Sequence, residues 1–161
     1  MAKVVNGRFA AELDGDFVVF LIGMRINRLL LPHKWLPVAM AMPRMLRELA
    51  RRKELGLLGA RGFVSGRTVL LVQYWRSFEQ LHAYACARDK EHLPAWAAFN
   101  RRVGGNGSVG IFHETYLVPA GQYESVYANM PEFGLGLAGK VVPAVGRMQS
   151  AKTRLERMDA E

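Results

Sequence analysis

Two stretches of the sequence combine histidine with aromatic and amide side chains. His92, Trp96 and Asn100 follow one another at intervals of four residues, in a segment from 91 to 102 whose pattern predicts a helix. Residues four apart lie on one helical face, so this polar and aromatic stripe can line a cavity. Imidazole exchanges a proton near neutral pH, which makes His92 a candidate general base. Packing at a subunit contact explains each of these residues equally well when it is taken singly.

The second stretch, His113-Glu114-Thr115-Tyr116, belongs to a predicted strand from 109 to 118. Neighbouring side chains of a strand point to opposite faces, so Glu114 and Tyr116 share one face and His113 lies on the other. Only one of these sets can point between a sheet and its helices. We take both His113 and Glu114 as catalytic candidates.

Several familiar kinds of site are missing or incomplete. The sequence has no G-x-S-x-G elbow, and His113-Glu114 lacks the second histidine of a zinc protease motif. The single cysteine, Cys86, excludes a multi-cysteine metal centre, and we expect it to be a small buried or half-buried helical residue. Gly134, Gly136 and Gly139 spell G-x-G-x-x-G, but no βαβ unit follows, so we do not expect dinucleotide binding.

The composition predicts one folded domain with a basic surface. Of the 161 residues 50% are apolar and 22% charged, and the formal net charge is +8. Such a charge attracts anionic partners of any kind, including nucleic acid, an acidic metabolite and an anionic membrane surface, although solubility alone also explains it. The run of cations from Arg44 to Lys53 lies at the end of a predicted helix, where it complements the helix dipole. We therefore predict no nucleic-acid partner.

No segment is apolar enough to cross a bilayer, since the longest uncharged apolar run covers only Val18 to Met24. Glu12, Asp14 and Asp16 stand where a secretory leader would be free of acids. With a single cysteine, these features lead us to expect a soluble, cytoplasmic protein without a membrane span.

The predicted strand from 16 to 27 is apolar on both faces. Val18, Phe20 and Ile22 lie on one face and Phe17, Val19 and Leu21 on the other. The domain's own helices normally cover only one face of such a sheet. We therefore expect a second subunit to cover the other, which predicts a homodimer.

The remaining elements complete a ferredoxin-like α+β pattern of antiparallel strands with helices on one face. Ser77 begins a helix with a capping-box pattern, and Pro43 should kink or break the first helix. We treat residues 1–161 as one domain with a helical extension at about 135–158. The other predicted segments are a helix at 33–55, a strand hairpin at 58–64 and 67–75, a helix at 78–87 and a strand at 123–129.

The chain resembles a family of small domains, formerly of unknown function, whose named member is a monooxygenase of the fungal fumagillin pathway. The likeness covers most of residues 16–136. It rests on the segments Met24-Arg25-Ile26-Asn27, Lys34-Trp35-Leu36-Pro37-Val38, Val72-Gln73-Tyr74-Trp75-Arg76-Ser77-Phe78, Glu91-His92-Leu93-Pro94-Ala95-Trp96, His113-Glu114-Thr115-Tyr116 and 123–131.

The resemblance implies a dimeric α+β barrel, the superfamily that includes cofactor-free antibiotic-biosynthesis monooxygenases and haem-degrading monooxygenases. In the haem-degrading members a histidine late in the helical stretch ligates iron. His92 stands at about that place, so the resemblance implies His92 as a haem ligand with Arg25 near a propionate. We therefore expect either no cofactor or haem. The expected substrate-binding residues are Arg25, Asn27, Trp35, Tyr74, Trp96, Asn100 and Tyr116.

We therefore expect a monooxygenase-like enzyme for an apolar or aromatic small molecule, held in a pocket between sheet and helices. A cofactor-free reaction needs a base, either His92 or His113, to make the substrate electron-rich. The alternative is a non-catalytic ligand- or haem-binding module of the same fold. Nucleic-acid binding through the basic helix is a third class.

Overall fold

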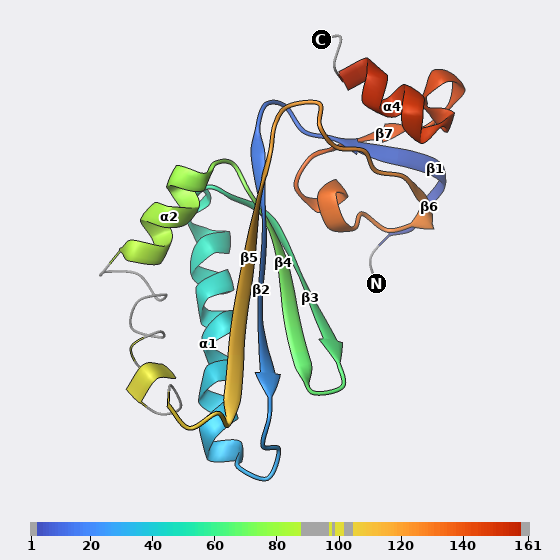
Figure 1. Cartoon of the computed structure of the whole chain (residues 1–161). Helices are drawn as coiled ribbons and strands as arrows, with labels where there is room; N and C mark the ends of the chain where they lie inside the picture. The colour runs from blue at the N-terminus through green and yellow to red at the C-terminus, as the bar shows by residue number, and fades with distance from the viewer. Residues whose placement is uncertain (1–2, 88–96, 98, 102–104, 159–161) are drawn as a thin grey trace.

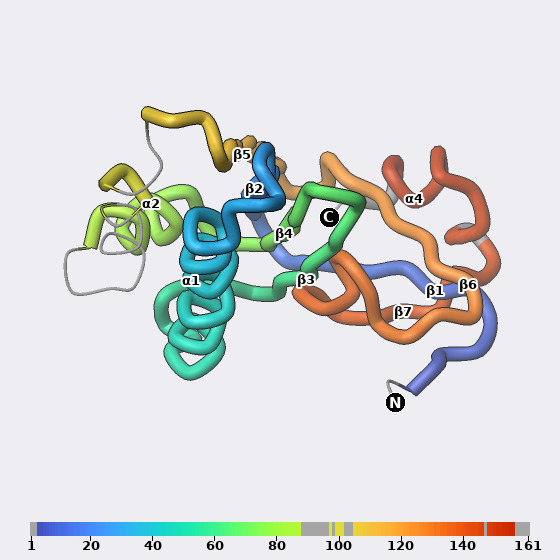
Figure 2. The backbone as a smooth tube through the Cα atoms, turned by 90° about the horizontal axis from the view of Figure 1, so that it is seen from below, coloured from blue at the N-terminus to red at the C-terminus, as the bar shows by residue number. Residues whose placement is uncertain are grey.

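A computed structural model describes residues 3–87, 97, 99–101 and 105–158 of the chain (Figure 1). Its main body is a four-stranded antiparallel sheet in the order β3-β4-β2-β5. These strands are β2 (Phe17–Ile26), β3 (Leu57–Ser65), β4 (Thr68–Trp75) and β5 (Val109–Val118). Two helices, α1 (Pro32–Arg51) and α2 (Phe78–Cys86), lie on the same face of this sheet (Figure 2). The ferredoxin-like α+β architecture predicted from the sequence is confirmed.

Helix α1 differs from its prediction at two points. It continues through Pro37 and Pro43, so the break that we considered at Pro43 is wrong, while the alternative of a kink there stays a prediction. Pro43 lies on the exposed side of the helix, while Met45 and Leu49 bury the opposite side. The helix ends at Arg51, and a separate 3₁₀ turn, η1 (Lys53–Leu55), follows it.

The connections on either side of the β3–β4 hairpin, from η1 to β3 and from β4 to α2, have the local structure that their sequences favour. The Ser77 hydroxyl accepts a hydrogen bond from Gln80 N at 3.2 Å, which confirms the cap of α2. Gly56, which follows η1, has a φ of 97°. A Cβ on Gly56 would lie 2.3 Å from Gln80 Oε1, so both backbone conformation and space require glycine there.

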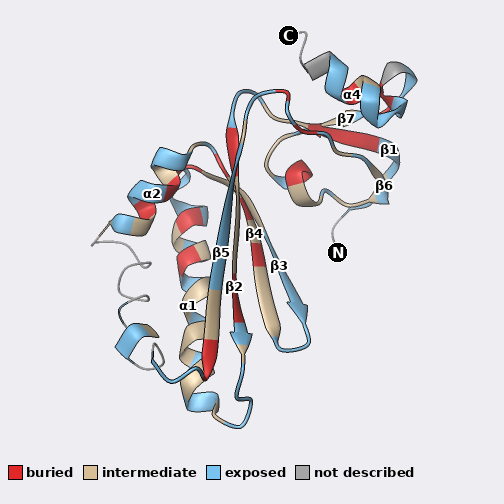
Figure 3. Cartoon of the chain, in the orientation of Figure 1, coloured by how far each residue is buried: buried red, intermediate tan, exposed pale blue. Residues whose placement is uncertain are grey.

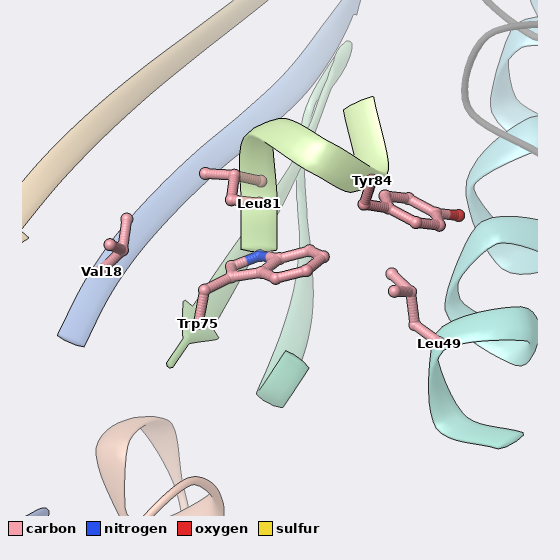
Figure 4. Packing of buried hydrophobic residues seen from close by; sticks show 5 residues of the cluster. All are labelled: Val18, Leu49, Trp75, Leu81 and Tyr84. Carbon is pink, nitrogen blue, oxygen red and sulfur yellow. The ribbon is translucent and has the colours of Figure 1, made fainter. Parts of the chain in front are cut away.

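The main core lies between the sheet and its two helices. Trp75 is 1% exposed and packs with Val18 of β2, Leu49 of α1, and Leu81 and Tyr84 of α2 (Figure 4). These residues come from four elements, so their packing fixes both helices against the sheet.

A second, three-stranded sheet stands beside the first, on the side away from α1 and α2 (Figure 2). Its antiparallel order is β6 (Tyr127–Met130), β1 (Val5–Glu12) and β7 (Lys140–Pro143). Our sequence analysis missed β1 and β7, and the predicted strand at 123–129 contracts to β6. The expected helix at 135–158 is replaced by β7, two 3₁₀ turns, η2 (Gly134–Leu137) and η3 (Gly146–Gln149), and the short helix α4 (Ala151–Met158).

This second sheet revises the argument for a dimer. Phe17 and Val19, on the face of β2 away from the helices, pack against Ala11, Tyr123 and Leu135 of the same chain. The chain therefore supplies part of the layer that we assigned to a second subunit. Figure 3 shows that much of β5 and the free end of β3 remain exposed.

No helix among the described residues is both long and apolar enough to cross a bilayer.

Candidate functional site

The strand register sorts the candidate residues onto the two faces of the main sheet. Ile22 pairs with Leu71 and with His113, which places His113 on the helix-covered face. Leu21 pairs with Glu114 and Val19 with Tyr74, so these candidates lie on the opposite face. The structure thus confirms that the two sets within β5 point in opposite directions.

A cavity of about 30 Å³ lies between the sheet and the helices, where we expected the pocket. Its lining is mainly apolar, which favours a dry interior. The lining residues are Phe20, Ile22, Met42, Met45, Leu49, Gln73, Trp75, Leu81, Tyr84 and Ala85. None of our described candidate residues is among them.

The one amide among the lining residues of this cavity belongs to Gln73, which the sequence analysis did not select. Gln73 is 5% exposed, and its Oε1 accepts a hydrogen bond from Trp75 Nε1 at 2.7 Å. An indole N–H can only donate, so this bond determines which end of the amide is the oxygen. The Nε2 group of Gln73 makes no hydrogen bond with any described residue and remains available as a donor. One sequence signal could have identified Gln73: it stands two residues before Trp75 in a predicted strand, so both side chains lie on the same face.

A larger hollow of about 240 Å³ lies outside the first, between η1 and α2. Leu55, Gln80 and Ala83 are among its lining residues. Tyr84 lines both hollows and donates from its hydroxyl to Glu48 Oε2 at 3.0 Å. Tyr84 therefore borders both the outer hollow and the inner, apolar cavity.

His113 lies close to the inner cavity without lining it. Its ring centre is 5.8 Å from that of Phe20, which does line the cavity, and the side chain is exposed. Among the catalytic candidates that the structure describes, His113 is the one on the cavity's side of the sheet.

Glu114 and Tyr116 form a pair on the other face, with the Tyr116 hydroxyl donating to Glu114 Oε2 at 2.5 Å. This hydrogen bond raises the pKa of the Tyr116 phenol. Burial, followed by the neighbouring Tyr127, raises the pKa of Tyr74. Arg25 lies exposed on this face as well. None of the four reaches the cavity beneath α1 and α2.

Asn27 and Trp35 hold the connection from β2 to α1. The Asn27 Nδ2 group donates to Gly107 O at 3.0 Å, and Trp35 Nε1 donates to Leu29 O at 3.1 Å. Trp35 also packs near Met24, on the helix-covered face. Asn100 is exposed, whereas His92 and Trp96 lie outside the described residues.

The inner cavity does not fit haem, whereas His92, the expected ligand, lies outside the described residues. A cavity of about 30 Å³ is far smaller than the pockets of several hundred Å³ that hold molecules of drug size, and a porphyrin is larger still. The described residues also contain no group of three or more side chains suited to a metal ion. Cys86, which we expected to be at least half-buried, is exposed, with Sγ 3.6 Å from His82 Nε2.

Comparison with known proteins identifies relatives. A family model described as Monooxygenase af470-like matches residues 17–135. Monooxygenase af470 of Aspergillus fumigatus is 32% identical, over 84% of this chain and 55% of its own length, so the chain spans about half of that relative.

Two solved structures are also similar. The first is SnoaB, a cofactor-independent oxygenase from Streptomyces nogalater, with 12% identity, a TM-score of 0.46 and coverage of 63% of this chain and 91% of that one. The second is Rv0793 from Mycobacterium tuberculosis, with 15% identity, a TM-score of 0.45 and coverage of 60% and 92%.

Proposed function

The chain belongs to the af470-like monooxygenase family, and on this premise we propose that it is a monooxygenase for an apolar or aromatic small molecule. The observation that carries the proposal is the inner cavity, where apolar side chains surround the single oriented amide of Gln73. Such a site suits a substrate with an apolar body and one oxygen that accepts a hydrogen bond.

The size of the cavity decides how a substrate lies. About 30 Å³ accommodates only a small reacting end, and a body that extends into the outer hollow requires the Tyr84 side chain to turn aside. A larger reacting end requires Met42 and Met45 to move, and unbranched methionine side chains repack readily.

The proposed reaction converts a CH₂ group beside a conjugated carbonyl or phenol into a ketone. A base removes one proton, and the resulting carbanion reduces dioxygen. One oxygen atom stays on carbon, while the other leaves as water with the two hydrogens of the CH₂ group. Negative charge grows on the substrate oxygen as the proton departs, and the Gln73 Nε2–H group stabilises it there. These steps use the substrate itself as the reductant.

His113 is the base that the described geometry favours, because its ring lies beside that of Phe20, which lines the cavity, on the same side of the sheet. His92 stays a candidate from the sequence alone. We assign Glu114 and Tyr116 no part in this cavity, because they lie on the opposite face.

We also propose that the enzyme is a homodimer. The part of the sheet's open face that the second sheet leaves uncovered carries Phe112, 37% exposed, and Tyr116, 51% exposed. Half-buried Leu21, Leu70 and Val72 lie on the same face. Burying these side chains against a second copy removes apolar surface from water. Light scattering after gel filtration measures the mass, and a monomer at micromolar concentration would refute the dimer.

The activity test supplies ¹⁸O₂ and a panel of polycyclic phenols and aryl ketones, with oxygen uptake and product mass as readouts. We expect incorporation of one ¹⁸O atom by the protein as purified, without an added cofactor. Gln73→Met should lower turnover at least tenfold with the fold retained. Substrate binding without oxygen uptake would indicate a ligand-binding module, and activity only after addition of haem, with a Soret band, would overturn the cofactor-free reaction.

A further inference from the structure

One end of the molecule presents apolar side chains to solvent. The connection from β2 to α1 carries Leu29, 46% exposed, and Leu30, 94% exposed. At the tip of the β3–β4 hairpin, Val64 is 76% exposed. The two tips lie at the same end of the main sheet (Figure 1), and Ile26 N donates to Arg67 O at 2.8 Å where β2 meets the hairpin. Together they form what we call the leucine tip, consisting of Arg28, Leu29, Leu30, Val64 and Arg67.

The leucine tip is held in a fixed shape. Leu31 N donates to Arg28 O at 3.3 Å, which closes a turn around the two exposed leucines. Trp35 Nε1 binds the Leu29 carbonyl, and Arg28 N donates to Ser108 O at 3.2 Å. Arg28, Leu29 and Leu31 are therefore engaged through the backbone, while the Leu30 side chain stays in water. Packing within the chain does not account for this exposure.

The apolar surface continues along the first half of α1. Leu36 is 48% exposed and Met40 is 51% exposed, on the side of the helix away from Met45 and Leu49. Farther along the same side of the helix lie Arg44 and Arg47, both exposed. Along this side of α1, apolar side chains therefore occupy the first half of the helix and cations the second half.

The two segments that form this end carry charge of one sign only. From Phe17 to Arg47 the sequence contains no Asp or Glu, and its cations are Arg25, Arg28, Lys34, Arg44 and Arg47. The hairpin segment from 55 to 78 likewise contains no acid, and it carries Arg61, Arg67 and Arg76. Within the described part of the chain, neither Arg28 nor Arg67 forms an ion pair.

We propose that the leucine tip docks the protein on the surface of an anionic lipid bilayer. Leu29, Leu30 and Val64 enter the boundary between headgroups and acyl chains, and Arg28 and Arg67 meet the lipid phosphates. A nucleic acid would satisfy the arginines but would offer no apolar phase to the leucines, so a bilayer suits both kinds of side chain. The proposal is independent of the chemistry under α1 and α2, and it would place an enzyme for apolar substrates where such molecules accumulate.

The experiment measures binding to vesicles of phosphatidylglycerol and phosphatidylcholine, 1:1, and of phosphatidylcholine alone. We expect the wild-type protein to sediment with the anionic vesicles at low salt and to be released as salt screens the charges. Arg28→Gln with Arg67→Gln should weaken binding at least tenfold, since each cation near such a surface contributes about fivefold. Leu30→Ser should weaken it about tenfold through lost apolar burial.

Matched controls separate this tip from the general positive charge. Arg8→Gln with Lys140→Gln removes two exposed cations from the second sheet, and Val145→Ser removes a side chain that is 66% exposed. Both controls should leave vesicle binding within twofold of wild type. Equal losses in control and test variants would overturn the proposal.

A reporter at the tip tests insertion itself. Leu30→Trp should show a blue-shifted emission on anionic vesicles and quenching by brominated acyl chains, whereas Val145→Trp should show neither. An unshifted Leu30→Trp spectrum on vesicles that bind the protein would overturn insertion. Tighter binding to duplex DNA than to vesicles, or a change of oligomeric state in Leu30→Ser, would assign the tip to another partner and overturn the proposal as well.

Discussion

Trp75 and Gln73 point to the same side of β4, and the indole N–H of the first donates to the side-chain oxygen of the second at 2.7 Å. Both side chains are buried, at 1% and 5% exposure. The bond satisfies the only polar atom of the indole ring and leaves the amide nitrogen of Gln73 as the free donor of a residue that lines the cavity. The most buried aromatic side chain of the main core therefore also orients the polar group of the candidate site.

The first prediction concerns the energy of this pair. Trp75→Phe leaves Gln73 Oε1 without its donor, and Gln73→Leu leaves the indole N–H without its acceptor. Each change should lower the free energy of unfolding by about 1–3 kcal/mol, because an unpaired buried polar atom loses its solvation. The double variant should lose clearly less than the sum of the two. Urea denaturation of all four proteins measures the coupling, and additive losses would contradict it.

The second prediction concerns Gly23, which is buried in the middle of β2. A Cβ at this position would lie 2.5 Å from the ring of Phe112 and 2.6 Å from Val69 O. Gly23→Ala should therefore destabilise the protein by about 1–3 kcal/mol. Adding Phe112→Ala should restore only part of the loss, because the contact with the backbone carbonyl remains.

Gly62 provides the control for this substitution. It lies in β3 of the same sheet, where an added Cβ would meet only Leu71 Cδ1, at 3.7 Å. Gly62→Ala should change the thermal midpoint far less than Gly23→Ala does. Similar shifts in the two variants would show that strand propensity, and not the close approach of β2 to its neighbours, determines the cost.

The third prediction concerns the attachment of α4. Arg154 is 5% exposed, and its Nη2 and Nε lie 2.7 and 2.8 Å from Glu124 Oε2. Glu124→Ala leaves a buried guanidinium without its carboxylate, which costs about 3 kcal/mol. We expect amide exchange in Ala151–Met158 to accelerate by about two orders of magnitude while the main sheet stays protected.

The exposed pair Lys152–Glu156 on the same helix is the comparison, at 3.7 Å. Glu156→Ala should change exchange in α4 only slightly, since such exposed pairs contribute less than about 0.5 kcal/mol. Equal acceleration in both variants would indicate that α4 frays independently of Arg154.

The fourth prediction concerns alkaline pH. Burial and the nearby Tyr127 raise the pKa of Tyr74 in the folded chain above its ordinary value of 10.0. At a pH between 10.0 and this raised pKa, the folded chain keeps a phenol proton that the unfolded chain releases. Tyr74 therefore contributes stability below pH 10, and this contribution is lost as the pH rises through the folded-state pKa. Tyr74→Phe should show a smaller fall in the free energy of unfolding from pH 9 to pH 11. An unchanged fall would contradict the burial of this phenol.

The local elements were predictable because their signals are local. The continuous run of apolar β-forming residues places β2 correctly, and residues at spacings of three and four place α1. The cap at Ser77 depends on residues 77 and 80 alone. The continuity of α1 through Pro43 was not predictable in this way, because the packing of Met45 and Leu49 outweighs a missing hydrogen bond.

The second sheet had no comparable signal. β6 and β7 have four residues each, too few to show a period, and β1 pairs with both across more than a hundred residues of sequence. Tyr123 illustrates the distance involved, because its hydroxyl donates to the carbonyl of Leu13, 110 positions earlier. Contacts of this kind exist only in the folded chain.

The amino-acid sequence by itself determined the order of the main strands and helices, the double apolar character of β2 and the absence of acids at the leucine tip, because each follows from residue type and short spacing. Only the tertiary structure decided that Gln73 and not Tyr74 lines the cavity, and that the chain covers Phe17 and Val19 itself. The register of paired strands sets which side chains face the helices, and the docking of distant segments sets which surfaces remain exposed. Both depend on interactions between residues that are far apart along the chain.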